Sequence, residues 1–210
     1  MERTGWKPID TGVSMVIGVT GGVGSGKSTV LELLKTEYQA YVIESDRCGH
    51  EVMQKGTAVY RKIAETFGDG ILKKDGEIDR KALGSIVFSD EEKRKMLNGL
   101  THPAIRELIR DKIHEAKKRG EPFIVLESAL FIEAGYREFC DELWYIYAAQ
   151  DIRIQRLMAS RGYTRQKCLK IMKTQLDEKE FERYADRKID NSKSPEDTKR
   201  QIDSIINYRY

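Results

Sequence analysis

The sequence contains few cysteines and none of the spacings that hold a metal ion. Its three cysteines, Cys48, Cys140 and Cys168, are odd in number and far apart among 210 residues. This pattern is typical of reduced thiols in a cytosolic protein rather than of a disulfide framework. No CxxC pair or Cys/His cluster indicates a zinc site. We therefore expect a cytoplasmic protein with reduced cysteines.

The sequence also has no large excess of either charge and no long apolar run. Lys and Arg total 37 and Asp and Glu total 34, which leaves a net charge of +3. A strong electrostatic case for a nucleic-acid partner needs a larger excess of one sign. No apolar run approaches the ~20 residues of a membrane span, and the N-terminus has no signal pattern. With 40% apolar and 34% charged residues, the composition predicts a soluble, compact protein and excludes a disordered chain.

Short apolar runs alternate with helical patterns along the chain, which favours parallel β-α-β units. Buried strands are predicted at residues 15–20, 40–43, 123–126 and 143–149, with a weaker fifth strand at 188–190. Helices are predicted from Lys27, over 151–160 with Asp151 as the N-cap, over 164–184, and from Pro195 onward. Together these elements predict an α/β fold with a parallel sheet of about five strands.

A long helical block separates the second predicted strand from the third. Residues 47–118 are broken by glycines at 56, 68, 70 and 76 and by His102-Pro103, and Asp75-Gly76 is a turn signal with short extended pieces on either side. The core strands come from residues 15–46 and 121–210. Residues 47–120 are therefore predicted to be an inserted lobe, and residues 1–14, which show no clear period, a loose leader.

One motif carries most of the chemical information. Residues 21–28 read GGVGSGKS, which matches the GxxxxGK[ST] phosphate-binding loop (the P-loop) in full. Glycines let the backbone N–H groups converge on phosphate oxygens, and the helix that starts at Lys27 directs its positive dipole end to the same place. Lys27 reaches the β- and γ-phosphates, and Ser28 offers a hydroxyl to Mg²⁺. The predicted ATP-binding residues here are Gly22, Val23, Gly24, Ser25, Gly26, Lys27, Ser28 and Thr29.

The fate of the γ-phosphate depends on residues outside the loop. No NKxD guanine motif and no SGG signature is present, so neither a GTPase nor an ABC-type ATPase is favoured. A small-molecule kinase needs an acid that orients the acceptor hydroxyl, a lobe that holds the acceptor, and arginines that cover the phosphates. The chain has candidates for all three.

Two acids follow predicted strands. Asp46 ends the second strand, which we expect beside the P-loop strand, and its carboxylate could orient or deprotonate the acceptor hydroxyl; the alternative is a helix cap. Glu127 follows the third strand and could hold a magnesium water; the alternative is a solvated strand-end acid. Four arginines share one helical stretch and could form a phosphate-covering flap or a plain solvated face: Arg153, Arg156, Arg161 and Arg165.

From about Met15 to Ile206 the chain resembles the dephospho-CoA kinase family. The resemblance is carried by the P-loop stretch GVTGGVGSGKSTV, by Glu44-Ser45-Asp46 after the second strand, by Asp79–Ile105 with its His102-Pro103 pair, and by Ala185–Ser194. It implies a three-layer P-loop kinase core with a small helical lid at about 153–184, and a lobe that binds the CoA moiety. It also implies Asp46 as the catalytic acid/base, Asn191 near the adenine, and Arg80 and His102 in the CoA-binding lobe.

The chain departs from the family in two places. The segment after the third strand reads Ala129-Leu130-Phe131-Ile132-Glu133, where the family has a proline first, and the resemblance assigns Leu130 and Glu133 to substrate binding. In the lid, Arg156 falls on a family arginine, whereas the next is displaced to Arg161. Arg156 and Arg161 are the predicted catalytic lid arginines.

The motifs predict a small-molecule kinase with Mg²⁺ held by Ser28 and Glu127. The resemblance implies that it transfers the γ-phosphate of ATP to the ribose 3′-hydroxyl of dephospho-CoA. We expect a monomer or small homo-oligomer without a membrane or nucleic-acid partner. One alternative is a kinase of another small hydroxyl acceptor, such as a nucleoside or sugar, against which the Asp79–Ile105 segment argues. The other is a nucleotide-dependent nucleic-acid-binding protein, suggested by the Lys/Arg-rich segment 161–173, although no RNA-binding aromatic motif is visible.

Overall fold

The computed structural model describes residues 14–207. Apart from Ser14, the predicted leader lies outside the described residues. The chain divides into two compact units, a core unit of Met1–Val42 and Glu115–Tyr210 and an inserted unit of Ile43–His114. Within the described part of the chain, no helix is long and apolar enough to cross a membrane. Cys48, Cys140 and Cys168 are all free thiols.

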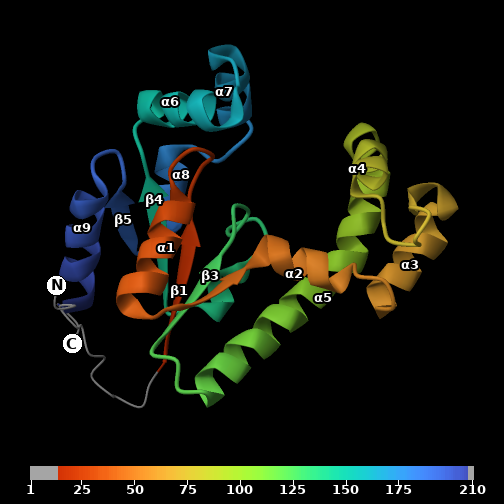
Figure 1. Ribbon diagram of the computed structural model, residues 1–210, viewed down its shortest axis with the longest axis horizontal. Coiled ribbons are helices and arrows are strands. Elements are labelled where there is room, and N and C mark those ends of the chain that lie inside the picture. Colours follow the sequence, from red (N-terminus) through yellow and green to blue (C-terminus); the bar gives the residue numbers. More distant parts are fainter. Residues whose placement is uncertain (1–13, 208–210) are drawn as a thin grey trace. The chain divides into compact units, whose positions relative to one another are not determined.

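The core unit is built around a five-stranded sheet (Figure 1). Its strands are β1 (Met15–Thr20), β2 (Tyr41–Glu44), β3 (Phe123–Glu127), β4 (Glu142–Tyr147) and β5 (Arg187–Asp190). The order is β2-β3-β1-β4-β5, and β1 pairs in parallel with both β3 and β4, as β4 does with β5. The predicted parallel α/β sheet is confirmed. The expectation that the second strand lies beside the P-loop strand is wrong, because β3 lies between them.

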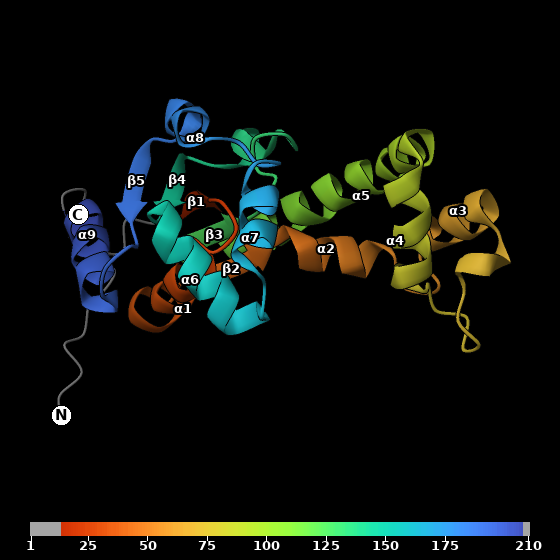
Figure 2. The ribbon, with the colours of Figure 1, turned by 90° about the horizontal axis from the view of Figure 1, so that it is seen from above.

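The two faces of the sheet are covered by different helices (Figure 2). Helices α1 (Lys27–Tyr38) and α9 (Pro195–Asn207) pack on one face, where Leu34 and Ile202 join Trp144 of β4 in one buried cluster. On the other face Tyr145 of β4 stacks on Phe181 of α8 (Glu178–Tyr184), with ring centroids 4.7 Å apart. Successive β4 side chains therefore face opposite layers, as the two-residue period of a strand requires.

The helices after β4 differ from the predicted ones in two respects. Helix α6 (Gln150–Arg161) has Ala149 as its N-cap, so Asp151 is an acid within the first turn and not the cap. The predicted helix over 164–184 is two helices, α7 (Arg165–Met172) and α8. Asp177 starts α8 with a capping box, because its side chain accepts from Glu180 N–H while the Glu180 carboxylate accepts from Asp177 N–H. This local capping signal marks the start of α8.

The inserted unit is helical and has its own buried cluster. It contains α2 (Ser45–Val52), α3 (Ala58–Phe67), a 3₁₀ turn at Asp69–Ile71, α4 (Arg80–Ser89) and most of α5 (Glu91–Lys118). Ile63, Ile71, Ile78 and Leu83 form the cluster. Leu72 and Ile78 make an antiparallel bridge on either side of the Asp75-Gly76 turn, where the sequence predicts short extended pieces. The predicted break at His102-Pro103 is wrong, because α5 continues through Pro103.

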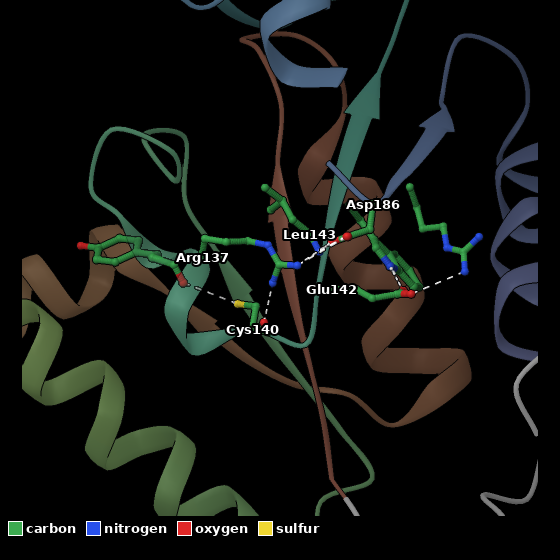
Figure 3. Close-up of polar contacts among 8 residues, drawn as sticks. Arg137, Cys140, Glu142, Leu143 and Asp186 are labelled. Carbon is green, nitrogen blue, oxygen red and sulfur yellow. Dashed lines mark hydrogen bonds and ion pairs between the residues drawn. The ribbon is translucent and has the colours of Figure 1, made fainter. Parts of the chain in front are cut away.

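A polar network fixes the amino ends of β4 and β5 (Figure 3). The Asp186 carboxylate, just before β5, accepts hydrogen bonds from Leu143 N–H at 2.7 Å and from Arg137 Nη2 at 3.1 Å. The buried Glu142 accepts from the Trp144 indole N–H at 3.0 Å. Because the strands are parallel, this edge of the sheet is opposite the edge from which the P-loop leaves β1.

Candidate active site

The P-loop connects the carboxyl end of β1 to the first turn of α1 and folds tightly because of its glycines. Gly26 has φ 85° and ψ 30°, a left-handed conformation that L side chains rarely adopt. A Cβ at this position would also collide with the side-chain amide nitrogen of Asn191. No acidic side chain lies in the first turn of α1, so the positive end of the helix dipole remains available to an anion.

Lys27 lies within the P-loop rather than extending into solvent. Its ammonium donates to the Gly21 carbonyl oxygen at 2.8 Å and is 3.9 Å from Glu127 Oε1. Both side chains are largely buried, with exposed fractions of 16% for Lys27 and 13% for Glu127. Glu127 is therefore not the solvated strand-end acid of the alternative interpretation. The structure brings together the predicted phosphate-binding lysine and the predicted magnesium-binding carboxylate.

The P-loop and the residues that flank it carry several hydroxyl groups. Ser28 and Thr29 are exposed at the start of α1, whereas Thr20 and Ser25 are buried and their hydroxyls have no hydrogen-bond partner among the described residues. Buried hydroxyls are normally satisfied, so these two orphaned groups suit a polar ligand held by the loop. Thr20 was not predicted, although its place as the last residue of β1 directly before the first P-loop glycine was a signal for it.

The oxygen donors present fit Mg²⁺ bound through substrate phosphates. Mg²⁺ usually keeps several waters and takes one or two protein oxygens together with phosphate oxygens. The Ser28 hydroxyl and the Glu127 carboxylate are donors of that kind. Within residues 14–207, no group of three or more His, Cys, Asp and Glu side chains forms an all-protein metal site, and this mode of binding does not require one.

Arg156 and Asn191 both donate hydrogen bonds to a backbone carbonyl of the P-loop. Arg156, on α6, donates to Ser25 O at 3.2 Å and to Asn191 O at 2.8 Å. The buried Asn191 side chain donates to Ser25 O at 2.8 Å and accepts from the Thr198 hydroxyl at 2.9 Å. Both ends of the Asn191 amide are thus used by protein groups. The structure thus brings both predicted site residues into contact with the P-loop, at the Ser25 carbonyl oxygen.

Two further residues bind the tip of the P-loop. Arg153 donates from Nε to Val23 O at 2.8 Å, and Gln175 accepts from Val23 N–H at 2.9 Å. Arg153 was one member of the predicted arginine flap, whereas Gln175 was not predicted. It lies in the turn between α7 and α8, and no local pattern marks it, because its contact with Val23 spans 152 residues of sequence.

The remaining core-unit candidates are exposed. Arg161 is the last residue of α6, and its guanidinium lies 6.0 Å from the centroid of the Tyr163 ring. Leu130 is 60% exposed in the turn after β3, and Glu133 is exposed in the same turn. The structure therefore does not bring these three side chains into the buried cluster around Lys27.

Three candidates lie in the inserted unit. Asp46 is an exposed acid in the first turn of α2, whose N-cap is Glu44, so the alternative of Asp46 as a helix cap does not hold. Arg80 is the exposed first residue of α4, and its own cap is Asp79. His102 is exposed on α5. None of the three side chains is buried, so each is accessible to a ligand within its own unit.

The inserted unit also contains a cleft of about 680 Å³. Its walls are mainly apolar or small, with an acid, an amide and a hydroxyl among them: Glu51, Val52, Gln54, Thr57, Ala58, Val59, Ala104 and Leu108. Lys112 forms an ion pair with Glu51 at 2.9 Å. Apolar walls with a few polar groups, in this range of volume, are typical of small-molecule sites.

Comparisons with known proteins agree with this geometry. The sequence profile of the dephospho-CoA kinase family matches residues 15–197. The dephospho-CoA kinase of Geobacter sulfurreducens is 40% identical over 195 residues, which cover 93% of this chain and 98% of the relative. That of Carboxydothermus hydrogenoformans is 41% identical over 191 residues, 91% of this chain and 92% of the relative. The solved dephospho-CoA kinase from Campylobacter jejuni has a TM-score of 0.71 and 28% identity, covering 94% of this chain and all of its own.

Proposed function

Since the chain belongs to the dephospho-CoA kinase family, its reaction is the transfer of the ATP γ-phosphate to the ribose 3′-hydroxyl of dephospho-CoA, and we propose which residues carry it out. The products are coenzyme A and ADP. Phosphoryl transfer needs little covalent chemistry from the protein, so catalysis consists mainly of positioning and electrostatic stabilisation.

The P-loop holds the triphosphate. The N–H groups of the loop and of the first turn of α1 bind phosphate oxygens, while Arg156 and Asn191 hold the loop carbonyls on the other side. Lys27 leaves the Gly21 carbonyl and contacts the β- and γ-phosphates, where its charge stabilises the transition state. Asn191 contributes to ATP binding through the shape of the loop, since its side-chain amide is already used. Arg161, exposed at the end of α6, covers the phosphates from the lid.

Mg²⁺ belongs to this site as the partner of ATP. Ser28 and Glu127 are the residues that would hold it, directly or through water. When bound, Mg²⁺ neutralises charge between the β- and γ-phosphates. The closeness of Glu127 to Lys27, 3.9 Å between Nζ and Oε1, keeps both side chains oriented before the substrates arrive.

Asp46 acts on the acceptor. Its exposed carboxylate accepts a hydrogen bond from the ribose 3′-hydroxyl and takes its proton as the bond to phosphorus forms. Arg80 and His102, in the inserted unit, are assigned to dephospho-CoA by the family resemblance. The same resemblance assigns Leu130 and Glu133, in the turn after β3, to substrate binding. The apolar cleft with its few polar groups suits an arm that has methyl, methylene and amide groups.

The observation that carries the kinase assignment is the P-loop itself, with Lys27 and Glu127 in contact and two buried hydroxyls left without partners among the described residues. The test is ADP release from ATP with a panel of acceptors: dephospho-CoA, adenosine, a pentose and water alone. We expect rapid release with dephospho-CoA and release at least a hundredfold slower with the others. Equal rates with adenosine or the pentose would favour a kinase of another hydroxyl acceptor.

A further inference from the structure

The tip of the P-loop is held by a closed ring of three hydrogen bonds. Arg153 Nε donates to Val23 O at 2.8 Å, and Val23 N–H donates to Gln175 Oε1 at 2.9 Å. Arg153 Nη2 donates to the same Gln175 oxygen at 3.3 Å, which closes the ring. Both polar backbone atoms of Val23 are therefore fixed by side chains from two distant segments, α6 and the turn between α7 and α8.

The packing around this ring fixes the same part of the loop. The Val23 side chain lies against the buried cluster of Ile154, Leu157 and Cys168. The Arg153 guanidinium lies over Gly22 so closely that a Cβ there would collide with Nη2. The loop tip is thus held by apolar contact on its Val23 side and by a flat guanidinium on its Gly22 side.

The charge of Arg153 has no acidic partner among residues 14–207. Arg165 and Lys188, on the neighbouring elements, form ion pairs with Asp151 and Glu178. In contrast, no described carboxylate lies within ion-pair distance of Arg153, whose hydrogen bonds go to neutral oxygens. Burial lowers the pKa of its guanidinium, the mark of a charge that is incompletely solvated. Such a charge is costly unless compensated, and the compensating anion that the reaction brings to this loop is the triphosphate.

We propose that Arg153 and Gln175 are positioning residues that clamp the P-loop at Val23 in its phosphate-binding shape before ATP arrives. With Val23 fixed, the N–H groups of the following residues converge on one point, so ATP binding does not have to order the loop. The clamp rests on the proposed use of ATP, but it concerns the affinity for the nucleotide and not the choice of acceptor. It assigns to the lid segment a role in shaping the empty loop, in addition to covering the bound phosphates.

The test measures ATP affinity by titration calorimetry in the absence of any acceptor. The variants are Arg153→Gln, Gln175→Ala and the double variant, with Arg183→Gln as the control, because Arg183 is an exposed arginine on α8. We expect each single variant to weaken ATP binding about tenfold, as loss of one shared hydrogen-bond unit would (~1.4 kcal/mol). The Kd of the double variant for ATP should be within twofold of that of the single variant that binds ATP more weakly, since both side chains hold the same atoms. The control should match the wild type.

Two further readouts separate a clamp from a general charge effect. Arg153→Lys keeps the charge but cannot bond Val23 O and Gln175 together, so we expect it to bind ATP as weakly as Arg153→Gln. Hydrogen exchange of residues 21–26 without nucleotide should be faster in Gln175→Ala than in the wild type. Gln175 is only partly buried, so this variant decides the matter if changes at Arg153 prevent folding.

The proposal is overturned if the single variants bind ATP within twofold of the wild type, if their losses multiply in the double variant, or if Arg153→Lys restores wild-type affinity. Unchanged hydrogen exchange in Gln175→Ala would overturn it as well. A wild type that binds ATP but does not phosphorylate dephospho-CoA would contradict the proposed function alone, because ATP affinity still reports on the clamp.

Discussion

At the scale of single residues, the site depends on charged groups that already have protein partners before substrate binds. Lys27 contacts Gly21 O and Glu127, and Arg156 contacts Ser25 O. A side chain held in this way has lost much of its rotamer freedom beforehand, so less entropy is lost when it turns to a phosphate. Asp46, by contrast, is exposed on α2, as a group that must meet a second substrate would be.

The role of Lys27 leads to the first prediction. In Lys27→Ala the charge that stabilises the transferring phosphoryl group is lost, so we expect kcat/KM to fall by about three orders of magnitude, which corresponds to ~4 kcal/mol of transition-state stabilisation. The measurement is steady-state ADP release with dephospho-CoA. Lys35→Ala, an exposed lysine on the same helix, is the control and should be unchanged. A Lys27→Ala rate within tenfold of the wild type would contradict the role of Lys27.

The second prediction is that a change at Asp46 lowers the turnover rate and leaves the affinity for ATP unchanged. Asp46→Asn keeps the shape of the side chain but removes the proton acceptor, so we expect turnover to fall about 10²- to 10⁴-fold while ATP affinity stays within twofold. Calorimetry with ATP and a single-turnover assay measure the two quantities separately. Asp69→Asn, an exposed acid of the same unit, should leave both unchanged. Unchanged turnover in Asp46→Asn would remove Asp46 from the mechanism.

The residues that could be predicted from the sequence differ from those that could not in one physical respect. Lys27, Ser28 and the loop glycines belong to one local motif, whose function follows from consecutive residues. Gln175 acts through Val23, a partner that only the fold brings near, and the bond between Arg153 and Val23 spans 130 residues of sequence. A local pattern carries no information about such a contact, so a flap of arginines could be predicted but the atoms that they bind could not.

At the scale of elements, the amino edge of the sheet is separate from the chemistry. Asp186 joins the start of β4 to the start of β5, whereas the P-loop leaves the opposite edge. In Asp186→Asn the hydrogen bonds from Leu143 N–H and Arg137 lose their charged acceptor, so we expect the free energy of unfolding to fall by about 1–3 kcal/mol. The melting temperature should drop by several degrees while the KM for ATP is unchanged.

The control for Asp186→Asn is a change in an ion pair on the surface. Asp151 and Arg165 form an ion pair whose side chains are 73% and 60% exposed, so Asp151→Asn should change the free energy of unfolding by less than about 1 kcal/mol. Thermal unfolding of both variants provides the comparison. If Asp186→Asn melts at the wild-type temperature, or raises the KM for ATP severalfold, the two edges of the sheet are not independent as described.

The elements themselves were predicted more accurately than their arrangement. The strands β1, β3 and β4 are short, mainly apolar runs, and burial on both faces explains that pattern. The fifth strand reads Arg-Lys-Ile-Asp and has one buried residue, Ile189, which is why its signal is weaker. The order of the strands is not encoded in such runs, which is why β3 rather than β2 lies beside β1. Pro103 reads as a helix break in the local sequence, so the continuation of α5 through it could not be predicted. The proline removes one N–H and therefore one hydrogen bond, and the 28-residue helix α5 has many others.

At the scale of the whole molecule, the small net charge conceals a local concentration of positive side chains at the P-loop. The chain has a net charge of only +3, yet Lys27 lies at the loop between β1 and α1 with Arg153 and Arg156 bonded to the same loop. A polyanionic nucleotide is attracted by this local group and not by the overall balance. The chain also divides into a core unit and an inserted unit, each with its own buried cluster.

The central claim is that this P-loop transfers the γ-phosphate of ATP to one hydroxyl of dephospho-CoA. The most direct measurement is phosphorus NMR of the product, with ADP measured in the same reaction. The account predicts one new phosphomonoester, on the ribose 3′-oxygen, for each ADP formed, and almost no product with Lys27→Ala. ADP formed at the same rate without dephospho-CoA, or a phosphate on any other atom of the acceptor, would contradict it.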